Sequence, residues 1–122
     1  MYSMTNKKIN KFNDIITELI KKSQLTQRQF EIILNERKKE KTRLPITSGA
    51  YYRQVKQIRI KLNRLQHTML LLSCFEIIDE KTINIILKLA KQVSLIKYSN
   101  QIMDIDKIIL VINQLIKQTK LL

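Results

Sequence analysis

The sequence predicts a single all-α domain, a compact bundle of about five helices around a long third helix. Three observations favour this fold class. The chain has 122 residues, which is a typical length for one domain. Hydrophobic residues make up 44% of it, which is enough for a core. It contains only one Gly and one Pro, whereas an all-β protein needs many of both for its turns.

The first two helices are predicted from apolar spacing and from a capping motif. Residues 6–22 form the first, because one face carries Ile9, Phe12, Ile15, Ile16, Leu19 and Ile20. The second begins at Thr26, since Thr26 and Gln29 have the spacing of a capping box. We expect the second helix to reach about Glu40 and to bury Phe30, Ile33 and Leu34.

The third helix is predicted to be long. Pro45 marks the connection that precedes it. We expect the helix to run from Ser48–Gly49 to about Cys74, with Thr47 or Ser48 as its N-cap. Apolar residues recur along it at alternating spacings of four and three: Tyr51, Val55, Ile58, Leu62, Leu65, Met69 and Leu72. This heptad stripe predicts a buried seam, and a homodimer formed through helical surfaces is left open.

Residues 79–122 are predicted to form two further helices, which carry little net charge and serve as a scaffold or an oligomerisation region. Asp79 fits the N-cap of the fourth helix and Asp104 that of the fifth. The inward positions expected on the fourth are Ile83, Ile86, Leu87, Ala90 and Val93. Those expected on the fifth are Ile105, Ile108, Ile109, Ile112, Leu115 and Ile116.

The positive charge is concentrated in the middle of the chain. The formal net charge is +13, and +8 of it falls between Arg28 and Arg64, where all six arginines lie. No carboxylate occurs between Lys41 and Phe75. Because the arginine fork suits phosphate oxygens and guanine edges, nucleic acid is the expected partner. The alternative for this cluster is a basic surface that keeps the protein soluble.

We therefore predict that residues 25–65 bind nucleic acid. On a helical wheel the third helix carries Arg, Lys, Gln and Asn side chains around its apolar stripe, and Lys61 is one of these lysines. Side chains of these four types are the ones that contact phosphates and base edges in protein–DNA complexes. Tyr52 could hydrogen-bond a phosphate or stack on a base, whereas Tyr51 is expected in the core. The predicted contact residues are Arg28, Arg37, Lys38, Lys39, Lys41, Arg43, Tyr52, Arg53, Lys56, Gln57, Arg59 and Arg64.

The motif Leu25–Thr26–x–Arg28–Gln29–x–Glu31 resembles the opening of helix-turn-helix domains of the LuxR and sigma-factor type. Residues 48–57 are similar to the start of their recognition helix. The resemblance covers about residues 25–65, although the Pro-containing connection stands where those families have a middle helix and a turn glycine. It implies a helix-turn-helix-like core, contacts from Tyr52, Arg53, Lys56 and Gln57, and a small DNA-binding transcription regulator or nucleoid protein. DNA is therefore favoured over RNA.

Catalysis, cofactors and metals are not expected. A single Cys and a single His, without clustered carboxylates, argue against a metal site, and the lone Gly49 rules out a Gly-rich phosphate loop. His67 has no catalytic neighbour at helical spacing, and Cys74 follows an apolar run that predicts a buried, inert thiol. The lone cysteine is typical of a reducing compartment, and no signal peptide is recognised, so a cytoplasmic protein is expected. No apolar run approaches about 18 residues, so membrane contact is not expected.

Two alternative functions remain at this point. A helical protein-interaction adaptor would use the Ile-rich segments of residues 79–122 to pair with a partner or with a second copy. An RNA-associated or ribosome-associated protein would use the same basic surface, because structured RNA and duplex DNA both attract such a surface through their phosphates.

Overall fold

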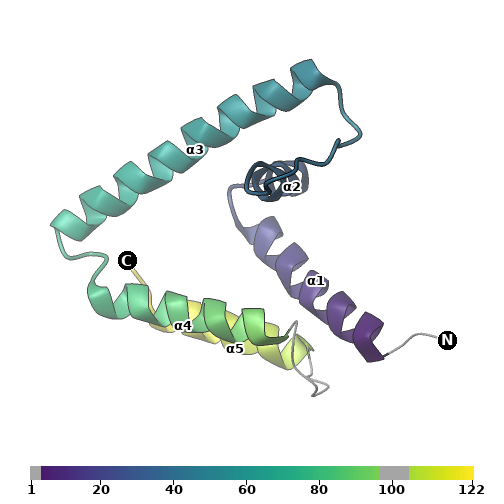
Figure 1. Ribbon diagram of the computed structural model, residues 1–122. Coiled ribbons are helices and arrows are strands. Elements are labelled where there is room, and N and C mark those ends of the chain that lie inside the picture. Colours follow the sequence, from purple (N-terminus) through teal and green to yellow (C-terminus); the bar gives the residue numbers. More distant parts are fainter. Residues whose placement is uncertain (1–3, 97–104) are drawn as a thin grey trace. The chain divides into compact units, whose positions relative to one another are not determined.

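The computed structural model of the chain is all-helical (Figure 1). It describes the backbone of residues 4–96 and 105–122, with the side chains of residues 12–96, 106, 109–114 and 116–122. These described residues form five helices and no strand, which confirms the all-α fold class. The helices are α1 (Met4–Lys22), α2 (Gln27–Glu36), α3 (Ser48–Cys74), α4 (Glu80–Ile96) and α5 (Ile105–Gln118). The chain divides into two units, residues 1–18 with 72–122, and residues 19–71.

The unit of residues 1–18 and 72–122 has a small aliphatic core. It is made by Ile15 of α1, Val93 and Ile96 of α4, and Ile112 of α5, all of which are buried. The partly buried side chains that pack against this cluster are Phe12, Ile16, Leu89 and Ile109. Each of the three helices thus buries one apolar stripe, and removal of that surface from water stabilises the unit.

The buried face of α4 differs from the prediction. Val93 is buried as expected, but Ile86 and Leu87 are 54% and 55% exposed, and Ala90 is exposed as well. Leu89 and Ile96 pack in the core with Val93, and these three residues have the spacing of one helical stripe. Because α4 carries apolar residues around most of its circumference, periodicity alone selects the wrong stripe.

The predictions for α5 are partly confirmed. Ile112 is buried and Ile109 is half-buried, whereas Ile116 is 53% exposed. Asp104 and the side chains of Ile105, Ile108 and Leu115 lie outside the described residues.

Asp79 is the N-cap of α4, as predicted. Its Oδ1 accepts a 2.8 Å hydrogen bond from the backbone N–H of Thr82. This bond holds the pKa of Asp79 below its ordinary value, because it favours the ionised carboxyl. Just before the cap, Glu76 has a φ of 59°, a left-handed conformation that ends α3.

In the unit of residues 19–71, α2 packs against α3 through apolar and polar side chains together. Ile32 of α2 and Ile58 of α3 are buried, and so are Gln29 and Asn35 of α2. The bounds of α3 match the prediction. Thr47 is its N-cap, since its Oγ1 accepts a hydrogen bond from the backbone N–H of Ala50 (3.2 Å).

The second helix is shorter than predicted. It ends at Glu36, where Arg37 closes the last turn by donating its N–H to the carbonyl of Ile33 (3.2 Å). The side-chain Oδ1 of Asn35 then accepts from the N–H of Thr42 (2.8 Å). This bond folds the segment after α2 back onto the helix, because the backbone of Thr42 bonds to a side chain of α2, so the charged run up to residue 41 does not continue α2.

The buried face of α2 was also predicted wrongly. Gln29, Ile32 and Asn35 are buried, whereas Phe30 and Ile33 are only half-buried and Leu34 is 50% exposed. Two of the three buried residues are polar, which is possible because each has hydrogen-bond partners.

The heptad stripe of α3 is buried only along its first half. Ile58 is buried and Val55 is half-buried, but Leu62, Leu65 and Met69 are 37%, 50% and 40% exposed. The prediction of a buried seam is therefore wrong for Leu62, Leu65 and Met69, whereas Leu72 at its end is half-buried. Cys74, predicted to be buried, is exposed as well.

Candidate nucleic-acid interface

One glutamine both caps α2 and binds α3. The backbone N–H of Gln29 donates to Thr26 Oγ1 (3.1 Å), and Gln29 Oε1 accepts from the backbone N–H of Thr26 (3.2 Å). These two bonds confirm the predicted capping box. Gln29 Oε1 also accepts from Lys61 Nζ (2.8 Å), and Gln29 Nε2 donates to Gln54 Oε1 (3.2 Å). The start of α2 is therefore fixed to the middle of α3 by the side chain of Gln29, whose position the cap itself sets.

A second set of hydrogen bonds joins the end of α2 to the start of α3. The Tyr51 hydroxyl donates to Glu36 Oε1 (2.7 Å) and accepts from Asn35 Nδ2 (3.0 Å). Lys41 Nζ lies 3.0 Å from Glu36 Oε2. The hydrogen bond from Tyr51, followed by that from Lys41, lowers the pKa of Glu36 below its ordinary value. Burial, followed by the hydrogen bond to Glu36, raises the pKa of Tyr51.

The side of α3 turned away from α2 is cationic. Arg59 is exposed but lines a groove between α2 and α3. We define the outer face of α3 by its other exposed predicted contact residues, Tyr52, Arg53, Lys56, Gln57 and Arg64. Their spacings place them on the half of the helix opposite the buried Ile58. The side chains of Arg53, Lys56 and Arg64 make no hydrogen bond or ion pair with any residue that the structure describes. Since α3 contains no carboxylate, these charges are free to meet an external anion.

Tyr51 and Tyr52 have different environments although they are adjacent. Tyr51 is half-buried and hydrogen-bonded, which agrees with the core position expected for it, while Tyr52 is 71% exposed. Their rings meet edge to face, with centroids 6.0 Å apart and an interplanar angle of 87°. Since Tyr51 is fixed by its hydroxyl, the ring of Tyr52 is held at the start of the outer face.

Apart from Arg59, the remaining predicted contact residues lie on α2 and on the connection formed by residues 37–47. Arg28 pairs with Glu31 (3.1 Å), and Lys41 pairs with Glu36, so these two charges are partly balanced by carboxylates. Besides Lys41, the exposed cations of the connection are Arg37, Lys38, Lys39 and Arg43. The structure thus brings five of the twelve predicted residues onto one helix face.

Lys61 is not part of the outer face, although it was predicted to lie among the polar side chains of α3 that contact nucleic acid. Its ammonium donates to Gln24 O and to Gln29 Oε1, both at 2.8 Å. The role of Gln29, Gln54 and Asn35 in joining the two helices was not predicted from the sequence, although Gln29 was predicted as part of the capping box. The available signal was that Gln29 and Asn35 share a helix face with Ile32, which polar residues seldom do unless they are bonded.

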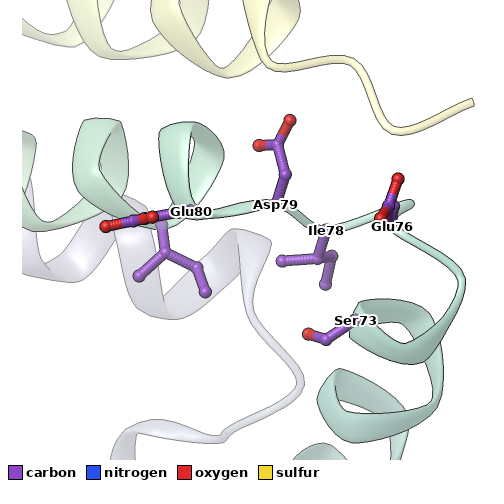
Figure 2. A pocket seen from close by; sticks show the side chains of 6 residues that line it. Ser73, Glu76, Ile78, Asp79 and Glu80 are labelled. Carbon is purple, nitrogen blue, oxygen red and sulfur yellow. The ribbon is translucent and has the colours of Figure 1, made fainter.

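An acidic pocket lies between the end of α3 and the start of α4 (Figure 2). It has a volume of about 510 Å³ and includes Glu76, Asp79 and Glu80 in its lining. The side chain of Glu80 points away from those of Glu76 and Asp79 (Figure 2), and Asp79 is engaged in capping α4. Among the described residues, no group of three or more His, Cys, Asp or Glu side chains is arranged to hold a metal ion. The pocket is therefore not a candidate metal centre.

Comparisons with family models, curated proteins and solved structures found no match for this chain. No helix within the described residues combines the length and the apolar character that a membrane crossing requires.

Proposed function

We propose that this protein binds nucleic acid through the outer face of α3 and catalyses no reaction. One observation carries the proposal: the outer face presents unpaired cations and an exposed tyrosine on a helix that has no carboxylate. The backbone of a nucleic acid carries closely spaced phosphate charges, and a row of cations of this kind neutralises several of them at once. A solubilising surface would not require three of the six arginines to lie on one helix that has no carboxylate.

Duplex DNA is the favoured partner in this proposal, as expected for a small transcription regulator or nucleoid protein. A helix fits the major groove, where Arg53 and Gln57 have the donors that read base edges. Lys56 and Arg64 would contact phosphates, and Tyr52 would contact a phosphate or a base. In this arrangement α2 supports α3, as in a helix-turn-helix, with residues 37–47 in place of the short turn of that motif.

The anchoring of α3 on α2 supports the proposal. A recognition helix reads its target only if its own position is fixed, and Gln29 and Tyr51 fix two points along α3. On α3 the bonded residues Tyr51 and Gln54 share the side of the buried Ile58, opposite the outer face, so a polyanion bound to the outer face would not compete with these bonds.

A gel-shift comparison tests this proposal with duplex DNA, single-stranded DNA and structured RNA of equal length, each at low and moderate salt. We expect the duplex to bind most tightly and its affinity to fall steeply with salt. Affinities that do not change with salt would contradict nucleic-acid binding by this face. Tighter binding of structured RNA would favour the RNA-associated or ribosome-associated alternative.

A protein-interaction adaptor is the second candidate, because several aliphatic side chains of α4 and α5 are exposed. Ile86, Leu87, Leu95 and Leu110 are each more than half exposed. Surfaces of this kind mark protein interfaces when they are contiguous. This candidate predicts a complex, or a homodimer in size-exclusion chromatography, that survives high salt.

A further inference from the structure

A groove with two arginines at its edge lies between α2 and α3, within residues 19–71. Its volume is about 190 Å³. Apolar side chains line it: Ile33 from α2, and Val55, Ile58 and Leu62 from α3. Ile58 is buried, whereas Arg37 and Arg59, which also line the groove, are exposed. The volume is below the range of drug-sized ligand pockets, so the groove suits one large side chain better than a whole small molecule.

The arginines of the groove form no ion pair with a carboxylate, although the charge of Arg59 acts on Glu36. Glu36 is the only acidic residue in the lining, and its two oxygens already accept from Tyr51 and pair with Lys41. The side chains of Arg37 and Arg59 form no hydrogen bond or ion pair with the described part of the chain. The groove therefore offers an apolar cavity beside two free guanidinium groups.

The apolar surface of the groove continues beyond the part of α3 that α2 covers. Ile58, Leu62 and Leu65 follow one another at spacings of four and three, and their exposure rises from 5% to 37% to 50%. This is the spacing at which a second helix packs its own apolar residues. The surface beyond Leu62 thus has the pattern of a helix-binding seam.

The charge of α3 decides which helix can lie there. A second copy of α3 would place its arginines and lysines against those of the first, and neither copy has a carboxylate to balance them. A helix with acidic residues beside its apolar stripe would instead meet Arg37 and Arg59 with opposite charge. We propose that this groove is a docking site for an acidic amphipathic helix of a partner protein.

Fluorescence anisotropy of a labelled helical peptide with the full-length protein tests the proposal. The probe is an Ala-rich peptide that carries Leu along one face and Glu beside it. Two matched peptides carry Lys for Glu, or Ala for Leu. We expect the Glu/Leu peptide to bind about tenfold tighter than either matched peptide, since both the charge and the inserted side chain contribute.

Matched protein variants locate the binding. Arg37→Gln/Arg59→Gln removes the two free cations of the groove, and Arg43→Gln/Arg64→Gln removes the same charge elsewhere on exposed positions. The first pair of substitutions should weaken binding of the Glu/Leu peptide about tenfold, and the second pair should weaken it less than about twofold. Circular dichroism of each variant shows whether its helices are retained.

Three results would overturn the proposal: equal binding of the Lys peptide, equal losses in the two variant pairs, or no saturable binding of the Glu/Leu peptide up to about 1 mM. The inference goes beyond the proposed function and does not depend on it. No nucleic acid is present in the assay, so either proposal can fail while the other stands.

Discussion

The hydroxyl of Tyr51, in the first turn of α3, donates a 2.7 Å hydrogen bond to Glu36, the last residue of α2. This bond closes residues 37–47 into a loop whose two ends are tied together. It also orients the next residue, Tyr52, whose ring packs edge to face against Tyr51. The position of the outer face of α3 therefore depends on a contact between two residues that were not predicted to meet.

Replacing Tyr51 with Phe should lower the free energy of unfolding by about 1 kcal/mol, because the ring stays but the donor to Glu36 is lost. Urea denaturation of the two proteins measures this difference. Tyr52→Phe is the matched control, since its ring is exposed and removal of its hydroxyl should change stability little. Equal effects of the two substitutions would show that the Tyr51 hydroxyl has no structural role.

The same contact predicts a pH dependence. The pKa of Glu36 lies below its ordinary value of 4.5, chiefly because Tyr51 and then Lys41 donate to the ionised carboxylate. A carboxyl whose folded pKa is lowered stabilises the fold above its unfolded pKa, and this contribution is lost as the pH falls through the folded pKa. We therefore expect the wild-type protein to lose more stability below pH 4.5 than Glu36→Gln does. Urea midpoints of the two proteins across acid pH measure the difference, and parallel curves would refute it.

Lys56 and Lys61 lie on the same helix and should have opposite roles. Lys61→Gln removes the bonds to Gln24 and Gln29, so it should lower the free energy of unfolding by about 1–2 kcal/mol. Lys56→Gln removes the same charge from an exposed position and should leave stability unchanged while weakening nucleic-acid binding. Denaturation and binding measurements on both variants check this pair. The assignment fails if Lys61→Gln weakens binding more than Lys56→Gln does without loss of stability.

The junction between α3 and α4 offers a stabilising substitution. Glu76 has a φ of 59°, a conformation that costs a residue with a Cβ about 1–2 kcal/mol. Glu76→Gly relieves this strain, although glycine loses more entropy on folding, so we expect a net gain of about 1 kcal/mol. Glu76→Ala keeps the Cβ and should give no such gain. Thermal or urea denaturation of the two variants distinguishes relief of backbone strain from removal of the carboxylate.

The parts of the fold that depend on local signals were predicted well. The capping box at Thr26, the N-cap at Asp79 and the full length of α3 were all confirmed. Each of these features depends on residues that are only a few positions apart in the sequence, because hydrogen bonds between such residues determine where a helix begins and ends. The concentration of cations was also evident from the sequence, and the structure shows which of them share the outer face of α3.

The features that depend on contacts between helices were not predicted. Apolar spacing placed Phe30 and Leu34 inside, but α2 instead buries Gln29 and Asn35, whose partners lie on α3. A hydrogen-bonded polar pair distant in sequence leaves no periodic trace. The end of α2 was missed for the same reason, since the bond from Thr42 to Asn35 is a side-chain contact. The resemblance to helix-turn-helix domains stays a prediction.

The salt dependence of duplex DNA binding tests the central claim most directly. The triple variant Arg53→Gln/Lys56→Gln/Arg64→Gln is compared with the control Lys81→Gln/Lys88→Gln/Lys91→Gln, which removes the same charge from exposed positions of α4. If the outer face of α3 contacts phosphates, the first variant should reduce the slope of log K against log salt by about 3, and the control should leave it near the wild-type value. Equal slopes for the two variants would contradict the assignment of nucleic-acid binding to this face.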